Sequence, residues 1–419
     1  MKRRVVITGI GVCTGVGRGV EAFWDGLTAG RSGICRVTLF DVGALPVRIG
    51  GQVRELNSDP LGSRFPEAEG ERDRKIWLGL DAATQAIEDA AVGEADLFEA
   101  VLAIGVSLET FFLNDVAPLA RTGDAVLAMR RIMLDTNQPR LQTPLDRLAE
   151  ILGNHYRFRG GRYTNCSACA AGTQAIGEAF RRVRDGAADV ALAGASDSVL
   201  NPLAMGGFSL LQILSTENEV PQAACRPFDA TRRGTVLGEG AAFLFLETAE
   251  RAETRGARVY AEVLGYGSSL DAYRVTDPEP SGKGAALSML KAMADAGLKP
   301  EAIDCINAHG TGTPKNDVAE TRSIKQALGM RAYEIPVTAS KSMTGHLIAA
   351  SGAVEAAASA LTLFTRKVPP TINLSERDPE CDLDYVPKVN QEFKGRTVLS
   401  NSFGFGGQNA TLVLGKFDL

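Results

Sequence analysis

The chain has 419 residues, of which 45% are hydrophobic and 23% are charged, so it can bury a large core and is neither disordered nor a coiled coil. Its 45 basic and 50 acidic residues leave a net charge of −5. This charge argues against a phosphate-neutralising surface, and we expect no nucleic acid partner. No linker or low-complexity stretch divides the chain.

The cysteines indicate a reducing compartment. Their number is odd and they are spread over a long chain, unlike the dense, even set of a small secreted domain held by disulfides. They are Cys13, Cys35, Cys166, Cys169, Cys225, Cys305 and Cys381. We therefore expect reduced thiols and a cytoplasmic location.

The first predicted element is a β-strand. The basic start and the run VVITGIGV resemble the beginning of a signal peptide, but glycines break the apolar run and no small-residue cleavage site follows. Residues 346–364 come nearest to a membrane span, yet they include His346, Glu355 and mostly small residues. They predict a buried helix, and we expect no membrane span.

Apolar runs and Ala-rich segments alternate along the chain, and many of its 45 glycines stand between them. Strands that alternate with helices predict an α/β fold. Residues 113–160 differ from this pattern because they are charged, helical in periodicity and poor in glycine. They form an excursion that suits a lid or a subunit contact, or else a solvated helical hairpin.

Internal similarity predicts a duplication. The segments NCSACAAGTQAIGEAF and MTGHLIAASGAVEAAASA each place a reactive residue before a helix of Ala, Gly and one Glu, and RRVVITGIG weakly resembles RVYAEVLGYG. Such internal similarities are typical of two fused halves. We predict an N-terminal half at 1–250, which contains the excursion, and a C-terminal half at 251–419.

Cys169 is the candidate nucleophile. It forms a lone CxxC pair with Cys166, but a zinc site would need further ligands, and a redox pair would need a thioredoxin-like context. Good helix formers follow Cys169, and the start of a helix stabilises a thiolate and lowers its pKa. The alternative is an inert, buried cysteine.

Two of the three histidines favour a thiol enzyme. His309 in NAHGTGTPKND and His346 in KSMTGH are flanked by Gly and Thr, which allow a ligand to approach the backbone closely. Lys341 and the second histidine stand where a cysteine protease would need an Asn or Asp. Two imidazoles that both donate from Nε2 to one oxygen suit a thioester enolate. Phe403 and Phe405 in NSFGFGGQNA offer an oxyanion amide or a movable gate.

These motifs resemble the β-ketoacyl-acyl carrier protein synthases of the thiolase superfamily, and the synthase II type above all. The resemblance covers nearly the whole chain and rests on RRVVITGIGVCTGVG, LTAGRSGI, RPFDATRRGTVLGEGAAFLFLE, HGTGTPKND, KSMTGHLIAASGAVEA and NSFGFGGQNATLVL. It implies a thiolase-like α/β fold in which two duplicated αβαβα halves form a five-layered α-β-α-β-α core.

The resemblance also implies a role for each motif residue. The implied set is Cys169 as nucleophile, His309 and His346 as catalytic histidines, Lys341 as active-site lysine, Phe405 as gate, Thr311 and Thr313 as pantetheine contacts, and Glu355 as organiser of the network behind Lys341. Turn formation is an equal explanation for the two threonines.

The implied reaction is ping-pong. An acyl group passes from its carrier protein to Cys169, malonyl carrier protein then loses carbon dioxide, and the resulting carbanion attacks the acyl thioester. The resemblance implies no metal and no organic cofactor. It implies acyl carrier protein as partner, and a homodimer or a heterodimer with a related ketosynthase subunit.

Several departures leave the substrate open. Asn165, Cys166 and Ala171 differ from the residues usual around the nucleophile, GVSLETFF replaces a Gly-rich loop, and Gln212 stands where a basic residue is common. A fatty-acid synthase and a specialised polyketide or polyene ketosynthase therefore both fit. A non-catalytic chain-length factor is disfavoured because the cysteine and both histidines are present, and a thiolase because the C-terminal loop lacks a second cysteine.

Two further hypotheses concern specificity and docking. The resemblance implies an acyl tunnel that runs past Leu108. A bulky Leu108, with Phe111, Phe112 and Phe208 nearby, should shorten or flatten this tunnel and favour short or rigid unsaturated chains, unless these residues are ordinary core. Arg74 and Lys75 in ERDRKIW are the candidate carrier-protein contacts, with solvated helix residues as the alternative.

Overall fold

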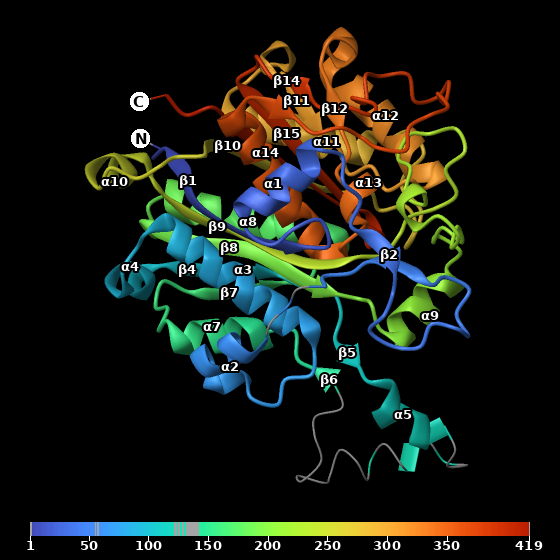
Figure 1. Ribbon diagram of the computed structural model, residues 1–419. Helices are drawn as coiled ribbons and strands as arrows, with labels where there is room; N and C mark the ends of the chain where they lie inside the picture. The colour runs from blue at the N-terminus through green and yellow to red at the C-terminus, as the bar shows by residue number, and fades with distance from the viewer. Residues whose placement is uncertain are drawn as a thin grey trace.

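The computed structural model describes residues 2–54, 56, 58–120, 124, 126–127, 130 and 142–418. A mixed sheet of ten strands runs through its centre (Figure 1). In spatial order the strands are β12 (Val337–Thr338), β11 (Cys305–Asn307), β15 (Thr397–Gly404), β16 (Gln408–Gly415), β10 (Ala261–Leu270), β1 (Val5–Thr14), β9 (Glu239–Thr248), β8 (Val190–Ser198), β4 (Val101–Gly105) and β7 (Arg162–Asn165).

The pairing pattern of this sheet reveals the duplication. From one edge inward, β4 pairs parallel with β7 and with β8. Strand β9 then pairs antiparallel with β8 and with β1. The series β12-β11-β15-β16-β10 repeats the same pattern. The two series meet where β1 pairs antiparallel with β10, with Val5 opposite Val263. The weakly similar segments RRVVITGIG and RVYAEVLGYG therefore lie side by side at the centre.

Helices cover the sheet and fill the space between its halves. The α-helices are α1 (Val20–Thr28), α2 (Ser58–Arg64), α3 (Arg74–Ala90), α4 (Glu94–Glu99), α5 (Leu113–Ala120), α7 (Arg147–His155), α8 (Ala171–Arg184), α9 (Pro202–Leu210), α10 (Ala249–Thr254), α11 (Lys283–Ala296), α12 (Pro314–Leu328), α13 (Lys341–Thr344) and α14 (Ser351–Thr365). Short 3₁₀ turns are η1 (Pro66–Ala68), η2 (Ala168–Ala170), η3 (Pro221–Ala223), η4 (Pro300–Ala302), η5 (Gly329–Tyr333), η6 (Ile348–Ala350) and η7 (Phe405–Gly407).

The layers follow from which helices touch which strands. Helix α3 packs on β1, β8 and β9, and α11 packs on β10 and β16. Helices α8 and α14 contact each other and strands of both half-sheets. Their approach is so close that a Cβ on Gly352 would lie 2.1 Å from the Thr173 hydroxyl. The order α, β, α, β, α confirms the predicted thiolase-like architecture.

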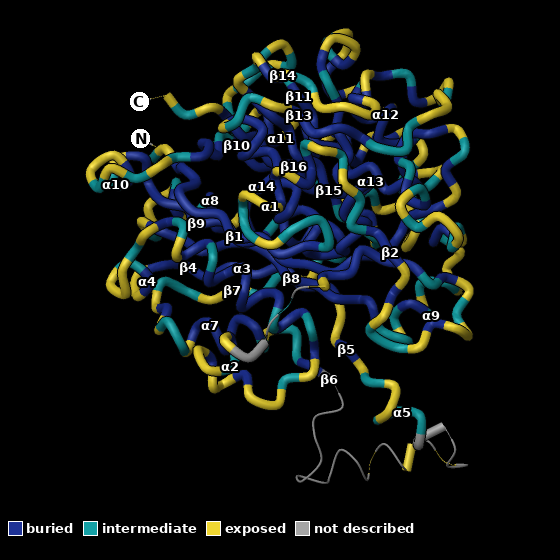
Figure 2. The backbone as a smooth tube through the Cα atoms, viewed as in Figure 1, coloured by how far each residue is buried: buried dark blue, intermediate teal, exposed yellow. Residues whose placement is uncertain are grey.

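The two central helices form the most buried part of the protein, which Figure 2 shows as a dark blue centre. The apolar stretch Ile348–Thr365, which begins in η6 and continues as α14, is long enough to cross a membrane, but 89% of it is buried inside the protein. It is therefore a core helix, as the sequence predicts.

Three short sheets are also present in the described part of the chain. They are β2 (Ile34–Arg36) with β3 (Ile49–Gly51), β5 (Thr110–Phe111) with β6 (Gln142–Thr143), and β13 (Lys367–Val368) with β14 (Gln391–Glu392). Within the predicted excursion, α7 packs Leu148, Ile151 and Leu152 into the core, whereas α5 lies outside the main body (Figure 1). Most of residues 121–141, in the middle of the excursion, lies outside the described residues.

Candidate active site

Cys169 lies in the turn that joins edge strand β7 to helix α8. Ala168 before it has a left-handed φ of +49°, and the turn η2 leads directly into α8. The end of β15 packs against this turn, where a Cβ on Gly404 would lie 3.0 Å from the Cys169 amide nitrogen. The thiol thus stands at a helix start, as predicted, and glycine at 404 lets the neighbouring strand approach it.

The environment of Cys169 corrects one expectation. Burial raises the pKa of the Cys169 thiol to about 11, although the Lys341 charge and the backbone N–H groups of Phe405 and Cys169 lower it in part. The helix start alone predicts a lowered pKa. That prediction was wrong because the side chain is only 4% exposed, and removing a thiolate from water outweighs the local stabilisation.

Alkylation should reveal this raised pKa. Between pH 8 and pH 10 we expect the iodoacetamide reaction of Cys169 to accelerate about tenfold per pH unit, because the thiolate is the reactive form and remains a minor species. Mass spectrometry of the Cys169 peptide measures the rate, and a Cys169→Ser variant corrects for the other thiols. A rate that levels off near pH 9 would show that the pKa is not raised.

His309 and His346 lie edge to face and line the same cavity. Their ring centroids are 5.3 Å apart at an interplanar angle of 83°. The Nδ1 atom of His309 accepts from Lys341 Nζ at 3.2 Å. The Nδ1 atom of His346 accepts from the Ile348 amide at 3.2 Å and from the Ser351 hydroxyl at 3.0 Å. With both Nδ1 atoms accepting, we assign both imidazoles as protonated on Nε2 and hence as hydrogen-bond donors.

The histidines are neutral. Burial is the largest cause that lowers the pKa of His309 and of His346 well below the usual 6.5, and the nearby Lys341 charge lowers both further. Neutral imidazoles keep Nδ1 free to accept while Nε2 donates. The pair therefore offers two N–H groups to an oxygen without carrying charge of its own.

A buried ion pair supports His309 from behind. Lys341 is completely buried and its Nζ donates to Glu355 Oε1. Burial raises the pKa of Glu355 to about 7, against the lowering effect of Lys341. The structure thus brings Lys341 and Glu355 together, as the resemblance implies, and Lys341 fixes the tautomer of His309.

Glu320 is a site residue that the sequence reading missed. Its carboxylate accepts the amide N–H groups of His309 at 2.8 Å and of Gly310 at 2.7 Å, and burial raises its pKa to about 7. These bonds fix the turn that carries the imidazole. The available signal was its place one turn after Asp317 in α12, on the face that carries the buried Ile324.

The cavity around the thiol has a volume of about 430 Å³. Besides the thiol and both imidazoles it is lined by Phe208, Phe403, Phe405, Thr311 and Thr313. The rings of Phe208 and Phe405 stack at 6.5 Å, and the hydroxyls of Thr311 and Thr313 are 2.9 Å apart. Each of these predicted residues therefore meets the candidate nucleophile in one space.

Leu108 lies elsewhere. It is 48% exposed and lines a separate pocket of about 230 Å³ with Phe111 and Asp197. Phe112 packs its ring under the Arg72 guanidinium at 4.0 Å. In the single chain, Phe208 alone of the proposed tunnel residues reaches the thiol cavity, and the effect on acyl length stays a prediction.

Arg74 and Lys75 do not form a docking surface. Lys75 is 1% exposed, and its Nζ bonds the Leu108 carbonyl oxygen at 2.6 Å and lies 3.1 Å from Asp73 Oδ2. Arg74 makes a bidentate contact with the buried Glu239 at 2.6 and 2.8 Å. Both charges are already neutralised within the protein, so the docking prediction was wrong at these positions.

An Arg74→Ala variant should therefore act on stability. Removing the guanidinium leaves Glu239 buried without a cationic partner, and we expect the free energy of unfolding to fall by about 3 kcal/mol. Urea denaturation measures the loss. An unchanged stability together with a raised Michaelis constant for a carrier protein would restore Arg74 to the docking surface.

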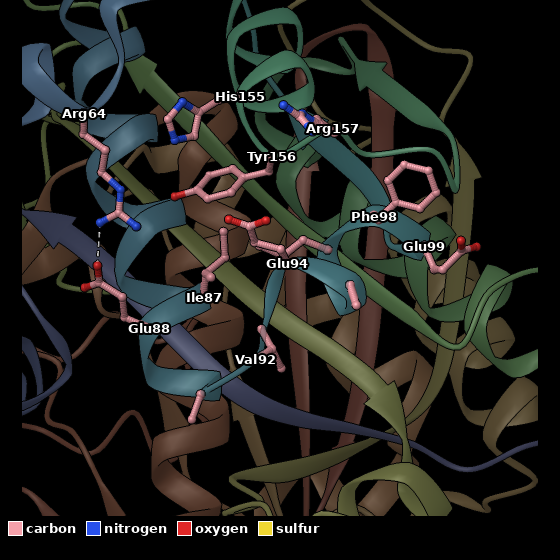
Figure 3. Close-up of a pocket in the computed structure, with 13 residues that line it drawn as sticks. Arg64, Ile87, Glu88, Val92, Glu94, Phe98, Glu99, His155, Tyr156 and Arg157 are labelled. Atoms are coloured by element: carbon pink, nitrogen blue, oxygen red, sulfur yellow. Dashed lines mark hydrogen bonds and ion pairs between the residues drawn. The ribbon is translucent and has the colours of Figure 1, made fainter.

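A larger hollow of about 1030 Å³ lies over α2, α3, α4 and α7 (Figure 3). It holds His155, the third histidine, whose ring packs on Phe65 at a centroid distance of 4.4 Å. Arg64 pairs with Glu88 across the same hollow. None of the predicted site residues lines it, so its size does not make it the catalytic cavity.

The fold and the cavity together define a class of protein, the thiolase-fold acyltransferases with a cysteine nucleophile. The chain matches the family described as Beta-ketoacyl synthase, N-terminal domain over residues 2–252, and Beta-ketoacyl synthase, C-terminal domain over residues 260–375. It belongs to the β-ketoacyl synthase family.

Among the described residues, no group of three or more His, Cys, Asp or Glu side chains is arranged to hold a metal ion.

Named relatives agree with this assignment. The chain is 41% identical to 3-oxoacyl-[acyl-carrier-protein] synthase 2 of Synechocystis sp. and 39% identical to that of Coxiella burnetii, over 99% of each chain. Among solved structures, it resembles the ishigamide ketosynthase/chain length factor, with a TM-score of 0.86 and 35% identity over both full lengths. It also resembles a type II polyketide ketosynthase solved with its acyl-carrier protein, with a TM-score of 0.84 and 34% identity over both full lengths.

Proposed function

We propose that Cys169 carries the acyl chain and that His309 and His346 stabilise the enolate in a decarboxylative condensation. The observation that carries this proposal is the meeting of one thiol and two neutral Nε2–H donors in a single cavity of about 430 Å³. Although burial raises the pKa of the Cys169 thiol, the backbone N–H groups of Phe405 and Cys169 lower it, which indicates that they lie against the sulfur. They would also hold the oxyanion of an acyl group transferred to it.

The first half-reaction is a transthioesterification. The Cys169 sulfur attacks the carbonyl carbon of the acyl thioester, the bond to the carrier sulfur breaks, and the thiol proton goes to the departing carrier thiolate. Phe405 and Phe208, which stack at 6.5 Å and line the same cavity, would contact the chain. No step of this transfer requires the two Nε2–H groups.

The second half-reaction uses both histidines. Malonyl carrier protein places its thioester oxygen between the two Nε2–H groups, the bond to the carboxyl group breaks, and carbon dioxide leaves as electrons move into the enolate. The enolate carbon then attacks the acyl carbonyl, the bond to the Cys169 sulfur breaks, and the thiolate takes up a proton from water. The product is a β-ketoacyl chain two carbons longer on the carrier.

Acyl carrier protein is the proposed partner. A related ketosynthase with 34% identity was solved with its acyl-carrier protein, which supports the same partner here. With Arg74 and Lys75 turned inward, the exposed cationic side chains that line the cavity are Arg233 and Lys315, of which Lys315 pairs with Asp277 at 2.8 Å. An acidic carrier protein would therefore approach over Arg233.

A dimer is the proposed assembly. Strand β7 forms one end of the ten-stranded sheet, and its outer edge pairs with no other described strand. An unpaired edge that includes the exposed Tyr163 suits pairing with a second subunit, and the ishigamide relative is a ketosynthase/chain length factor pair. We propose a homodimer or a heterodimer with a related subunit, acting in the cytoplasm, where its seven free cysteines stay reduced.

The proposal also includes the division of the chain into halves 1–250 and 251–419.

A preference for short or rigid unsaturated acyl chains is a further part of the proposal. Incubation with a series of acyl carrier proteins, followed by malonyl carrier protein, tests the activity and this preference by intact-mass spectrometry. We expect an acyl adduct on the enzyme and a β-ketoacyl product. Equal loading of long saturated and short chains would contradict the proposed preference, and no adduct with any chain would contradict the proposed function.

A further inference from the structure

The turn that carries His346 is strained. Ile348, two residues after the histidine, has a left-handed φ of +47°, which a β-branched side chain rarely adopts. Its amide N–H is one of two donors to His346 Nδ1, at 3.2 Å, beside the Ser351 hydroxyl at 3.0 Å. The orientation of the imidazole therefore depends on a backbone conformation that must be held from outside.

Asp197 is the side chain that holds it. This buried residue lies near the end of β8, and its Oδ2 accepts the amide N–H of Ala349, the residue after the strained Ile348, at 3.0 Å. Its Oδ1 accepts the amide N–H of Ser198 at 3.0 Å, which fixes the carboxylate itself. A charged acceptor in a buried setting makes strong hydrogen bonds.

Asp197 lies near the end of β8, and the other half of the duplicated fold has an equivalent position at the end of β15. Strands β8 and β15 occupy equivalent places in the two half-sheets, and so do the turns η2 and η6. The end of β15 packs on η2, where Gly404 meets the Cys169 turn. The end of β8 packs on η6, where Asp197 bonds the Ala349 amide. In each half, the end of the equivalent strand, β8 or β15, thus supports the reactive turn of the other half.

The backbone of His346 itself has other supports. Its amide N–H donates to the Val236 carbonyl oxygen at 2.7 Å and its carbonyl oxygen accepts from the Gly238 amide at 2.9 Å. Loss of the Asp197 contact would therefore leave the residue in place. It would free the turn after it and with it one of the two donors to Nδ1, so that the Ser351 hydroxyl alone would hold the orientation and tautomer of the ring.

We propose that Asp197 is a positioning residue for the condensation step, which acts by holding the Ile348–Ala349 turn and through it the orientation and tautomer of His346. The inference rests on the proposed role of His346 in decarboxylation. It assigns Asp197 no contact with substrate. Acyl transfer to Cys169 does not use the histidine, and burial and the Asp197 charge both raise the pKa of the Cys169 thiol, so loss of Asp197 should not slow acyl transfer.

Two separate assays on one set of variants test the inference. Acylation of Cys169 is followed by intact mass, and malonyl carrier protein decarboxylation by carbon dioxide release, for Asp197→Ala, Asp197→Asn, His346→Ala and the double variant Asp197→Ala/His346→Ala. We expect Asp197→Ala to slow decarboxylation at least about tenfold, because small displacements of a reacting group are costly, with acylation within about twofold of wild type. Asp197→Asn keeps one acceptor oxygen and should lose less.

The double variant separates positioning from general damage. If Asp197 acts through His346, the double variant should decarboxylate no more slowly than His346→Ala. Asp81→Asn is the matched control: Asp81 is also a buried carboxylate, and it pairs with Arg18 without lining the thiol cavity. It should leave the ratio of the two rates unchanged even if it lowers the melting temperature.

Two results would overturn the inference. One is a wild-type decarboxylation rate in both Asp197 variants while His346→Ala is slow. The other is a double variant slower than His346→Ala by the full factor that Asp197→Ala shows alone. A wild-type rate in His346→Ala itself would instead remove the proposed role of the histidine, so the two failures are distinguishable.

Discussion

Replacement of Cys169 by alanine is expected to abolish the acyl-enzyme and to reduce condensation by a factor on the order of 10⁶, the scale seen when a covalent nucleophile is removed. Cys166→Ala is the matched control, since Cys166 lies three residues away, is exposed, and donates to the Ser107 carbonyl oxygen at 2.9 Å. Its removal should leave loading intact because its sulfur is not held by the Phe405 amide.

Peptide mapping after loading with an acyl carrier protein measures this result. The adduct should lie on the Cys169 peptide fragment in wild type and in Cys166→Ala, and be missing in Cys169→Ala. An adduct on Cys166 with Cys169 free would contradict the assignment, because the buried turn η2 would then serve no acyl transfer.

Loss of either histidine is expected to separate the two half-reactions. His309→Ala and His346→Ala should each slow malonyl decarboxylation by about a hundredfold or more, since each removes one preorganised Nε2–H donor from the enolate oxygen. Cys169 should still be acylated at close to the wild-type rate, because the amides of Cys169 and Phe405 serve that step.

Carbon dioxide release from malonyl carrier protein gives the first rate and intact mass gives the second. His155→Ala is the matched control, as this histidine lies in the separate hollow of Figure 3. A variant of His309 or His346 that decarboxylates as fast as wild type would show that its imidazole does not hold the enolate.

The reactive residues of the site could be predicted from sequence because their signals are local. Cys169 precedes a run of helix formers, and His309 and His346 are surrounded by Gly and Thr. Such small residues allow the tight turns in which the structure places all three. The duplication also left a local trace, since RRVVITGIG and RVYAEVLGYG form the two paired central strands β1 and β10.

The corrected residues depend on contacts between distant parts of the chain, whereas the missed Glu320 bonds the amides of the nearby His309 and Gly310. The sequence predicts Arg74 as a carrier-protein contact or a solvated helix residue until Glu239, on strand β9, is placed beside it. The pKa of Cys169 is raised by burial that the helix start does not reveal. Asp197 reads as the end of a strand, and only the packing of β8 on η6 shows what its carboxylate holds.

The most direct test of the central claim is a single-turnover experiment on the acylated enzyme. The enzyme is first loaded with an acyl group, the excess carrier is removed, and malonyl carrier protein is added while the mass of the Cys169 peptide fragment and of the carrier is followed. The account predicts that the acyl mass leaves Cys169 at the same rate as a β-ketoacyl chain two carbons longer appears on the carrier. Product that forms while the acyl group remains on Cys169 would contradict it.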